Sequence, residues 1–125
     1  MKSLLYLFHR GIPYRPRKIL MNPKDYMVAK ELKEQLFDIT SLVDIIVFGS
    51  RARGDPDEYS DLDISIIVPS LNTELKERIY EIVWQVGFDN YMVISPIVFT
   101  KDEIANSPLR SAPIVKNILE EGIRI

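Results

Sequence analysis

The chain has 125 residues, of which 46% are hydrophobic and 27% charged, and its formal net charge is -2 at pH 7. This length suits one domain with a real core, and the composition gives no overall attraction to nucleic acid or to an anionic membrane. The absence of cysteine excludes disulfides and thiolate metal sites, and no run approaches the ~18 apolar residues of a membrane span, so we expect a cytoplasmic protein.

The first 20 residues differ in charge from the rest of the chain. They contain no acid and five basic residues, which are Lys2, Arg10, Arg15, Arg17 and Lys18. The apolar run at 4–8 is too short for a signal peptide, and the prolines that follow favour an extended chain. We therefore expect a basic N-terminal arm at residues 1–20 and one domain at residues 21–125. Such an arm is most often solvated, and binding to RNA or an acidic partner is the alternative.

A helix and two strands are predicted in the first half of the domain. Asn22 can cap a helix that has proline at its first position, and apolar residues recur at helical spacing from Val28 to Ile39. Apolar and β-branched runs at 43–48 and 62–68 predict two strands. A charged segment joins these two strands.

A second helix and a third strand follow. Asn72 or Thr73 can cap the helix, whose apolar face is expected to bury Trp84 and which is expected to end at Gly87. The run at 91–99 predicts a strand, and the proline within it assigns this strand to a sheet edge or a bulge.

The C-terminal part predicts one short helical turn and a last helix. Thr100 and Glu103 have the spacing of a capping box, and the last helix ends at Gly122 with Pro113 in its first turn or at a kink. The order α, β, β, α, β, α predicts an α/β (α+β) domain. We expect a small mixed sheet of three or four strands with helices packed on one side.

Two aspartates stand at the start of the second strand. Because side chains alternate along a strand, Asp61 and Asp63 lie on one face, about 7 Å apart at their backbones. Two carboxylates so placed repel each other, and hard oxygen ligands suit Mg²⁺. The pair therefore indicates a metal site, and the alternative is a solvated acidic turn in which Asp61 caps the loop.

The residues after the first strand suit a phosphate group. Gly49 lets the backbone come close to a ligand, and the Ser50 hydroxyl can hydrogen-bond a phosphate oxygen. Arg51 and Arg53 can contact phosphate or, instead, pair with the acids that follow them, which are Asp55, Asp57 and Glu58. Together with the paired carboxylates, these residues describe a site for a nucleotide and a metal.

Two other motifs in this segment fail on spacing. Residues 49–54 have the GxxxxG of a P-loop, but Asp55 and Pro56 stand where Lys and Ser or Thr are required. The acids that follow resemble a calcium loop, but Ser60 replaces its turn glycine and Ile66 its terminal glutamate.

The sequence GSRARG at 49–54 followed by SDLDISIIV at 60–68 resembles the signature of the DNA polymerase beta type nucleotidyltransferases. It is most similar to the small stand-alone MNT proteins, which include antitoxins paired with HEPN toxins. The likeness covers about residues 22–122. Neither GS nor DxD alone is specific, but the combined motif is.

The resemblance implies Mg²⁺-dependent transfer of a nucleoside monophosphate, often AMP, from ATP or another triphosphate to an acceptor hydroxyl. The nucleotide-binding residues would be Gly49, Ser50, Arg51 and Arg53, and the catalytic and metal-binding residues Asp61 and Asp63. The implied acceptor is a small molecule or a partner protein, such as a tyrosine of a helical HEPN toxin. A homo-oligomer is the other assembly that we consider, and no membrane or nucleic-acid partner is expected.

One departure from the family pattern concerns a third acid on the next strand, which completes metal binding and deprotonates the acceptor in that family. The run YMVISPIVF at 91–99 has no acid, and Ser95 takes the place; Asp89, just before the strand, is a poor substitute. The alternative function is therefore a catalytically weakened nucleotide-binding subunit that acts by binding its partner.

Overall fold

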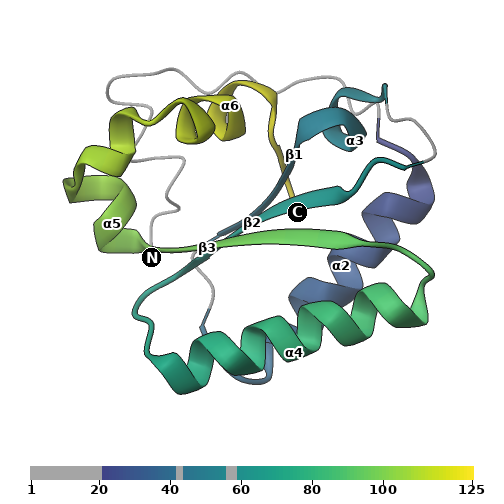
Figure 1. Cartoon of the computed structure of the whole chain (residues 1–125), viewed down its shortest axis with the longest axis horizontal. Coiled ribbons are helices and arrows are strands. Elements are labelled where there is room, and N and C mark those ends of the chain that lie inside the picture. The colour runs from purple at the N-terminus through teal and green to yellow at the C-terminus, as the bar shows by residue number, and fades with distance from the viewer. Residues whose placement is uncertain (1–20, 42–43, 56–58) are drawn as a thin grey trace.

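The structure, a computed structural model, describes residues 21–41, 44–55 and 59–125. The expected N-terminal arm at 1–20 lies outside the described residues, as do Leu42, Val43 and 56–58. The described chain folds around one sheet, with helices above and below it (Figure 1).

The sheet is mixed and has four strands in the order β3-β2-β1-β4. The strands are β1 (Asp44–Phe48), β2 (Leu62–Val68), β3 (Ile94–Thr100) and β4 (Ile123–Arg124). β1 is antiparallel to both of its neighbours, β2 and β4, whereas β2 and β3 are parallel and are joined through a helix. The mixed sheet and the edge position of β3 were expected. β4 was not, because two residues carry no periodicity.

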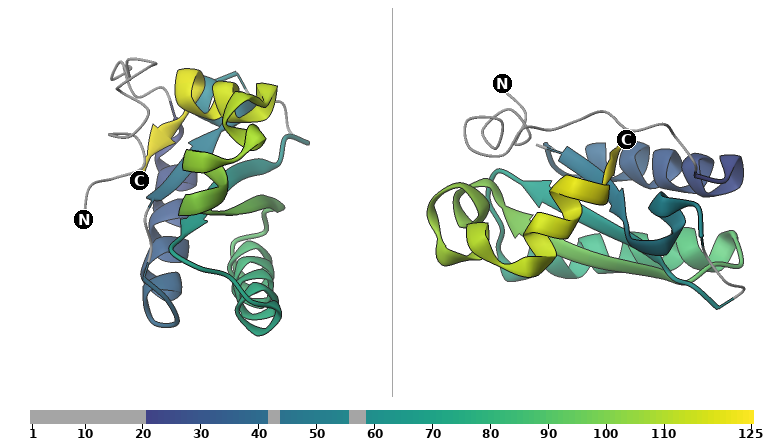
Figure 2. Two further views of the ribbon diagram at one scale, coloured as in Figure 1. Left: turned by 90° about the vertical axis from the view of Figure 1, so that its left-hand side faces the viewer. Right: turned by 90° about the horizontal axis from the view of Figure 1, so that it is seen from above.

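Two long helices cover one face of the sheet. They are α2 (Pro23–Phe37) and α4 (Thr73–Asp89), which lie side by side below the strands (Figure 2). The side chains of this layer come from both helices and from alternate residues of β1 and β2: Leu32, Leu36, Ile79, Val83, Ile45, Val47, Ile64 and Ile66.

The C-terminal elements cover part of the other face. They are α5 (Lys101–Asn106), the 3-10 turn η1 (Pro108–Ser111) and α6 (Pro113–Glu121). The second core joins these elements to the remaining strand residues: Ile46, Phe48, Ile67, Phe99, Ile104, Val115, Ile118 and Leu119. The expected α/β class is confirmed. The helices lie on both faces rather than on one, because every residue of β1 is buried and its side chains point alternately to either side.

The helix caps follow the sequence. The Asn22 side chain accepts a hydrogen bond from the Lys24 amide at 2.8 Å, and the Asn72 side chain one from the Leu75 amide at 2.7 Å. The expected capping box at the start of α5 is also present. None of the helices in the described part of the chain is long and apolar enough to cross a membrane.

Two expectations for α4 are wrong. The helix continues past Gly87 to Asp89, and this glycine is needed because a Cβ there would lie 2.6 Å from the Met92 carbonyl oxygen. Trp84 is 65% exposed rather than buried. The residues that face the sheet are Ile79, Val83 and Val86, and Trp84 follows Val83, about 100° further round the helix.

Candidate functional site

The segment after β1 forms a tight turn into the five-residue helix α3 (Gly49–Arg53). The sequence indicated a glycine turn here but not the helix. The turn requires glycine at 49, because its φ of +74° lies in the left-handed region that other residues rarely adopt. Gly54, with a φ of +81°, ends the helix in the same conformation. Ser50 and Arg51 are thus fixed on a short turn at the end of a buried strand.

The carboxylate of Asp63 lies directly against the backbone of Gly49. Asp63 is paired with Phe48 in the β1–β2 ladder, which brings it next to the start of α3. A Cβ on residue 49 would overlap the Asp63 Oδ2 atom and lie 3.3 Å from its Cγ. Glycine is therefore needed here for close approach as well as for its backbone conformation.

The pair Asp61 and Asp63 is electrostatically unfavourable when no cation is bound. Burial raises the pKa of the Asp63 carboxyl, and the charge of Asp61 raises it further, whereas the charge of Arg53 lowers it by less. Asp63 is half-buried and Asp61 exposed. Among the described residues no group of three or more His, Cys, Asp or Glu side chains could hold a metal, so this pair is the full carboxylate set. A carboxylate at the start of β2 and a second one just before the strand fit a hard divalent cation that has further ligands from a nucleotide.

Ser95 lies beside Asp63 on the neighbouring strand. The two residues are partners in the parallel β2–β3 ladder, and partners in a ladder project from the same face. Ser95 is half-buried. The register therefore brings this hydroxyl, and not an acid, next to the aspartate pair.

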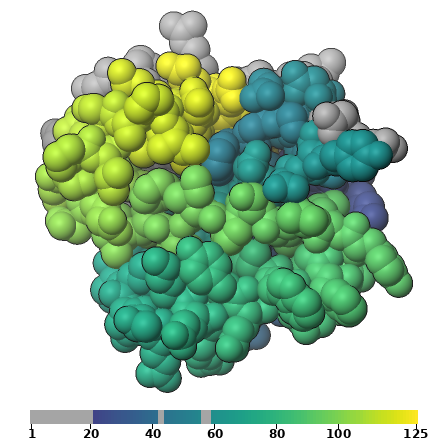
Figure 3. All heavy atoms as spheres, in the orientation of Figure 1, coloured from purple at the N-terminus to yellow at the C-terminus, as the bar shows by residue number. Residues whose placement is uncertain are grey.

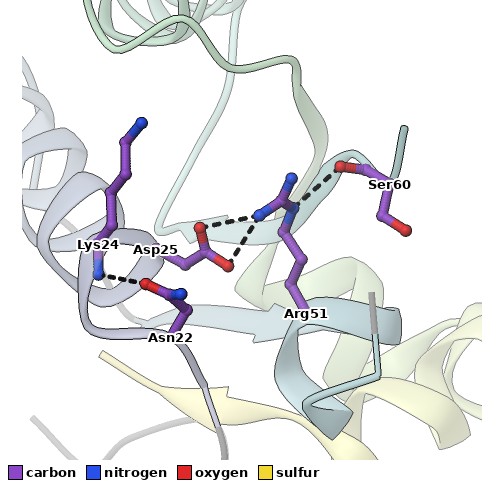
Figure 4. A network of polar contacts seen from close by, with 5 residues as sticks. All are labelled: Asn22, Lys24, Asp25, Arg51 and Ser60. Carbon is purple, nitrogen blue, oxygen red and sulfur yellow. Dashed lines mark hydrogen bonds and ion pairs between the residues drawn. The ribbon is translucent and has the colours of Figure 1, made fainter. Parts of the chain in front are cut away.

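The Arg51 side chain is hydrogen-bonded to two other segments of the chain (Figure 4). Its Nη1 donates to both carboxylate oxygens of Asp25 at 2.9 Å, and its Nε donates to the Ser60 carbonyl at 2.9 Å. The Asp25 and Arg51 side chains are 3% and 18% exposed. The arginine thereby links α2, α3 and the residue before Asp61, so its main contacts are structural.

Arg53 lies on the outside of the same helix. Its side chain is 40% exposed and forms ion pairs with Asp55 and, at 2.9 Å, with Glu121 at the end of α6. These contacts raise the pKa of the guanidinium, Glu121 contributing most. Of the acids proposed as alternative partners, Asp55 is used, and Asp57 and Glu58 lie outside the described residues. An arginine on an exposed ion pair can still turn toward a bound phosphate.

The structure thus brings together Gly49, Asp63 and Ser95, with Ser50 and Asp61 on the adjoining turn and strand end. Sequence reasoning missed Asp25, which is 2% exposed in the first turn of α2. The signal available was an acid at a buried position of an amphipathic helix, which requires a partner of opposite charge.

The comparison with known families agrees with this geometry. The profile of a nucleotidyltransferase domain matches residues 28–125, which is most of the chain and includes Gly49, Asp63 and Ser95. The chain belongs to the nucleotidyltransferase domain family. The family expected from the GSRARG and SDLDISIIV motifs is thereby confirmed.

Individual relatives of this nucleotidyltransferase agree. Two proteins of Methanocaldococcus jannaschii, each named a "putative protein adenylyltransferase", are 36% identical over 89 residues and 30% identical over 109 residues. These alignments cover 63% and 82% of this chain and 90% and 68% of the relatives. A solved structure described as a "putative nucleotidyltransferase" from Sulfolobus solfataricus superposes with a TM-score of 0.50 at 23% identity, over 86% of this chain and 87% of that one, which supports the fold.

Proposed function

We propose that this nucleotidyltransferase transfers AMP from ATP to a protein hydroxyl, using Mg²⁺ held by Asp61 and Asp63. The observation that carries the proposal is the position of Asp63, whose carboxylate lies against the bare backbone of Gly49 and beside another acid. The two carboxylates destabilise the fold when no cation is bound, and only glycine at position 49 leaves room for Asp63. Both properties are expected of a binding site rather than of a solvated turn.

The residues around the pair would have distinct roles. The backbone at Gly49 and the Ser50 hydroxyl would bind the triphosphate, and Arg53 would turn from its exposed ion pairs to offset phosphate charge. A divalent ion at the two carboxylates supplies charge stabilisation at the reacting phosphorus. Arg51 would act indirectly, because its bonds to Asp25 and Ser60 hold the segment that leads into Asp61.

The acceptor is proposed from the relatives, whose names describe protein adenylyltransferases. A domain of this size has little surface with which to enclose a second substrate, so a partner protein that presents its own hydroxyl suits it. A tyrosine of a helical HEPN-type toxin is the specific acceptor that we propose, with the chain as its antitoxin.

Ser95 favours a second candidate function, in which the chain binds nucleotide and partner but transfers slowly or not at all. The residue paired with Asp63 is Ser95, and a serine hydroxyl cannot act as a base at neutral pH. In the first candidate the partner supplies the base, or two carboxylates suffice. In the second, nucleotide binding supports partner binding only.

Two measurements distinguish these candidates. Isothermal titration with ATP, with and without Mg²⁺, measures binding, and α-phosphate-labelled ATP with the partner measures transfer. Asp61→Asn and Asp63→Asn should each abolish Mg²⁺-dependent binding and labelling, whereas Asp102→Asn, an exposed aspartate on α5, should change neither. Binding without labelling would favour the second candidate. Absence of Mg²⁺-dependent binding by the wild type would refute both.

A further inference from the structure

The outer surface of α4 carries a line of exposed aromatic side chains. Tyr80, Trp84 and Phe88 are 40%, 65% and 65% exposed and follow one another at intervals of four residues, which places them on one side of the helix. The rings of Trp84 and Phe88 stack with their centroids 5.2 Å apart. In the space-filling view α4 and the edge strand β3 lie together on the surface facing the viewer (Figure 3).

This aromatic row continues into a wider apolar surface. Tyr91 and Val93, which follow α4, are 96% and 66% exposed. A groove of about 730 Å³ runs between α4 and β3, where Trp84 and Pro96 are among its lining residues. The five exposed side chains present roughly 600 Å² of mainly apolar surface, which lies at the upper end of the ~300–600 Å² of the largest patch on a typical monomer and is somewhat less than the ~800 Å² that each partner buries in a stable complex.

The spacing of the row fits a second copy of the same chain. We propose that the chain forms a symmetric dimer through antiparallel packing of α4 on α4, with Trp84 on the two-fold axis. Because Tyr80 and Phe88 lie four residues to either side of Trp84, the axis brings Tyr80 against Phe88 of the partner subunit, and the reverse. Such self-complementary contacts are what a two-fold interface requires, and rows at intervals of four residues pack into each other between crossing helices.

The charges along α4 are compatible with this arrangement. Glu77 and Glu81 line the groove on the N-terminal side of Trp84. Antiparallel packing brings them toward the C-terminal half of α4 of the partner subunit, so the glutamates of the two copies do not meet. A parallel arrangement would bring these acids together, and like charges in contact are destabilising.

The neighbouring edge strand is poorly suited to be the main contact. β3 lies at the edge of the sheet, and Pro96, its third residue, has no N–H to donate. Strand pairing across the two-fold axis would therefore be interrupted. The helix row carries the interface, and Ile94 and Pro96 border it.

The interface leaves the nucleotide site accessible. Asp63 projects from the sheet face that carries Phe48 and Ile67, whereas α4 packs against the face that carries Val47 and Ile64. Dimer formation and nucleotide binding are thus separate properties, and a failure of one proposal leaves the other intact.

Sedimentation equilibrium of the full chain tests the dimer directly. The wild type should associate to a dimer between low and high micromolar concentration. Trp84→Ser should raise the dissociation constant at least tenfold, with an unchanged circular dichroism spectrum. The matched control is Phe37→Ser on α2, which removes an aromatic side chain that is 54% exposed and lies outside the row. A monomer at every concentration, or a dimer that Trp84→Ser does not weaken, would overturn the proposal.

The sequence offers two further measurements. Trp84 is the only tryptophan, so its emission should shift to shorter wavelength as the concentration rises. Because the chain has no cysteine, Trp84→Cys should form a disulfide-linked dimer on mild oxidation, whereas Phe37→Cys should not. The protein could instead be a monomer in which deletion of residues 1–20 shifts the tryptophan emission to longer wavelength. That result would show that residues 1–20 cover the aromatic row, and it would also overturn the dimer.

Discussion

Two aspartates at the same end of the sheet have opposite environments. Asp25 is 2% exposed, and both of its oxygens accept hydrogen bonds from Arg51. Asp63 is half-buried, lies against Gly49, and has another acid rather than a base as its strongest charged neighbour. The more deeply buried carboxylate is the one with a cation, as desolvation requires. Among the described residues, the less buried one forms no ion pair, and the weaker charge of Arg53 does not offset that of Asp61, so Asp63 is suited to binding a cation from outside.

We propose that this difference distinguishes Asp25, a carboxylate that stabilises the fold, from Asp63, a carboxylate that binds a cation. Removing Asp25 leaves Arg51 unpaired, so it should cost stability. Removing the charge of Asp63 relieves its repulsion by Asp61 and the cost of burying a carboxylate, so stability should increase. Function should be lost, because the proposed cation loses a ligand. The following experiments test this distinction.

The largest effect on stability is expected for Asp25→Ala. This change leaves a largely buried guanidinium without its carboxylate, and we expect the free energy of unfolding to fall by about 2–4 kcal/mol. Urea denaturation measures it, with Glu34→Ala, an exposed acid on the same helix, as the control that should stay within about 0.5 kcal/mol. If Arg51→Ala is combined with Asp25→Ala, the two losses should be less than additive. Equal costs for Asp25→Ala and Glu34→Ala would contradict the structural role.

Gly49→Ala should have the next largest effect. An alanine in the left-handed region costs about 1–2 kcal/mol, and here its Cβ would also displace the Asp63 carboxylate. Mg²⁺-dependent binding of ATP should therefore be lost. Gly54→Ala is the control for strain alone, because Gly54 has a similar φ at the other end of α3. Retained ATP binding in Gly49→Ala would show that the close approach to Asp63 is not required.

A smaller effect of opposite sign is expected for Asp63→Asn. In the presence of EDTA at neutral pH this variant should be more stable than the wild type by up to about 0.5 kcal/mol, because solvent screens a half-exposed group. Saturating Mg²⁺ should reduce or reverse the difference by stabilising only the wild type. A clear loss of stability in EDTA would place Asp63 in the same class as Asp25.

The dependence of this difference on pH is the finest test. The pKa of Asp63 is raised in the folded state above its ordinary value of 3.8, so the folded protein holds this proton more tightly than the unfolded chain. The protonated Asp63 therefore contributes its full stabilisation when the pH is below the ordinary pKa. This stabilisation is lost as the pH rises through the raised pKa of the folded state. The stability of the wild type relative to Asp63→Asn should fall with rising pH in that interval. A rise instead would show that a cation of the protein already pairs with Asp63.

The sequence predicted those features of the fold and the site that depend on local periodicity. Asn22 and Asn72 cap helices as expected, and alternation along β2 correctly places Leu62 and Ile64 on the face opposite Asp63. Ser95 was matched to the site from the family pattern of a third acid on the next strand, and the parallel β2–β3 register pairs it with Asp63.

Features that depend on contacts between distant segments were not predictable. Arg51 has acids within a few residues in the sequence, yet it pairs with Asp25, 26 positions away, because the start of α2 lies beside α3. Trp84 was placed in the core because α4 has more apolar residues than one helix face can hold. Periodicity alone cannot tell which of two adjacent apolar rows faces the sheet.

The β1–β2 ladder also bears on how this site can change during evolution. Phe48 and Asp63 form the last pair of a continuous antiparallel register that begins at Asp44 and Ile67. A slip of one residue would send the carboxylate to the opposite face of the sheet and bring a neighbouring leucine or isoleucine against Gly49. Insertions in the connection after Gly54 would leave this pairing and the turn at Gly49 intact, whereas a single insertion within either strand would remove the site. The connection is therefore where relatives can diverge in length while retaining the same chemistry.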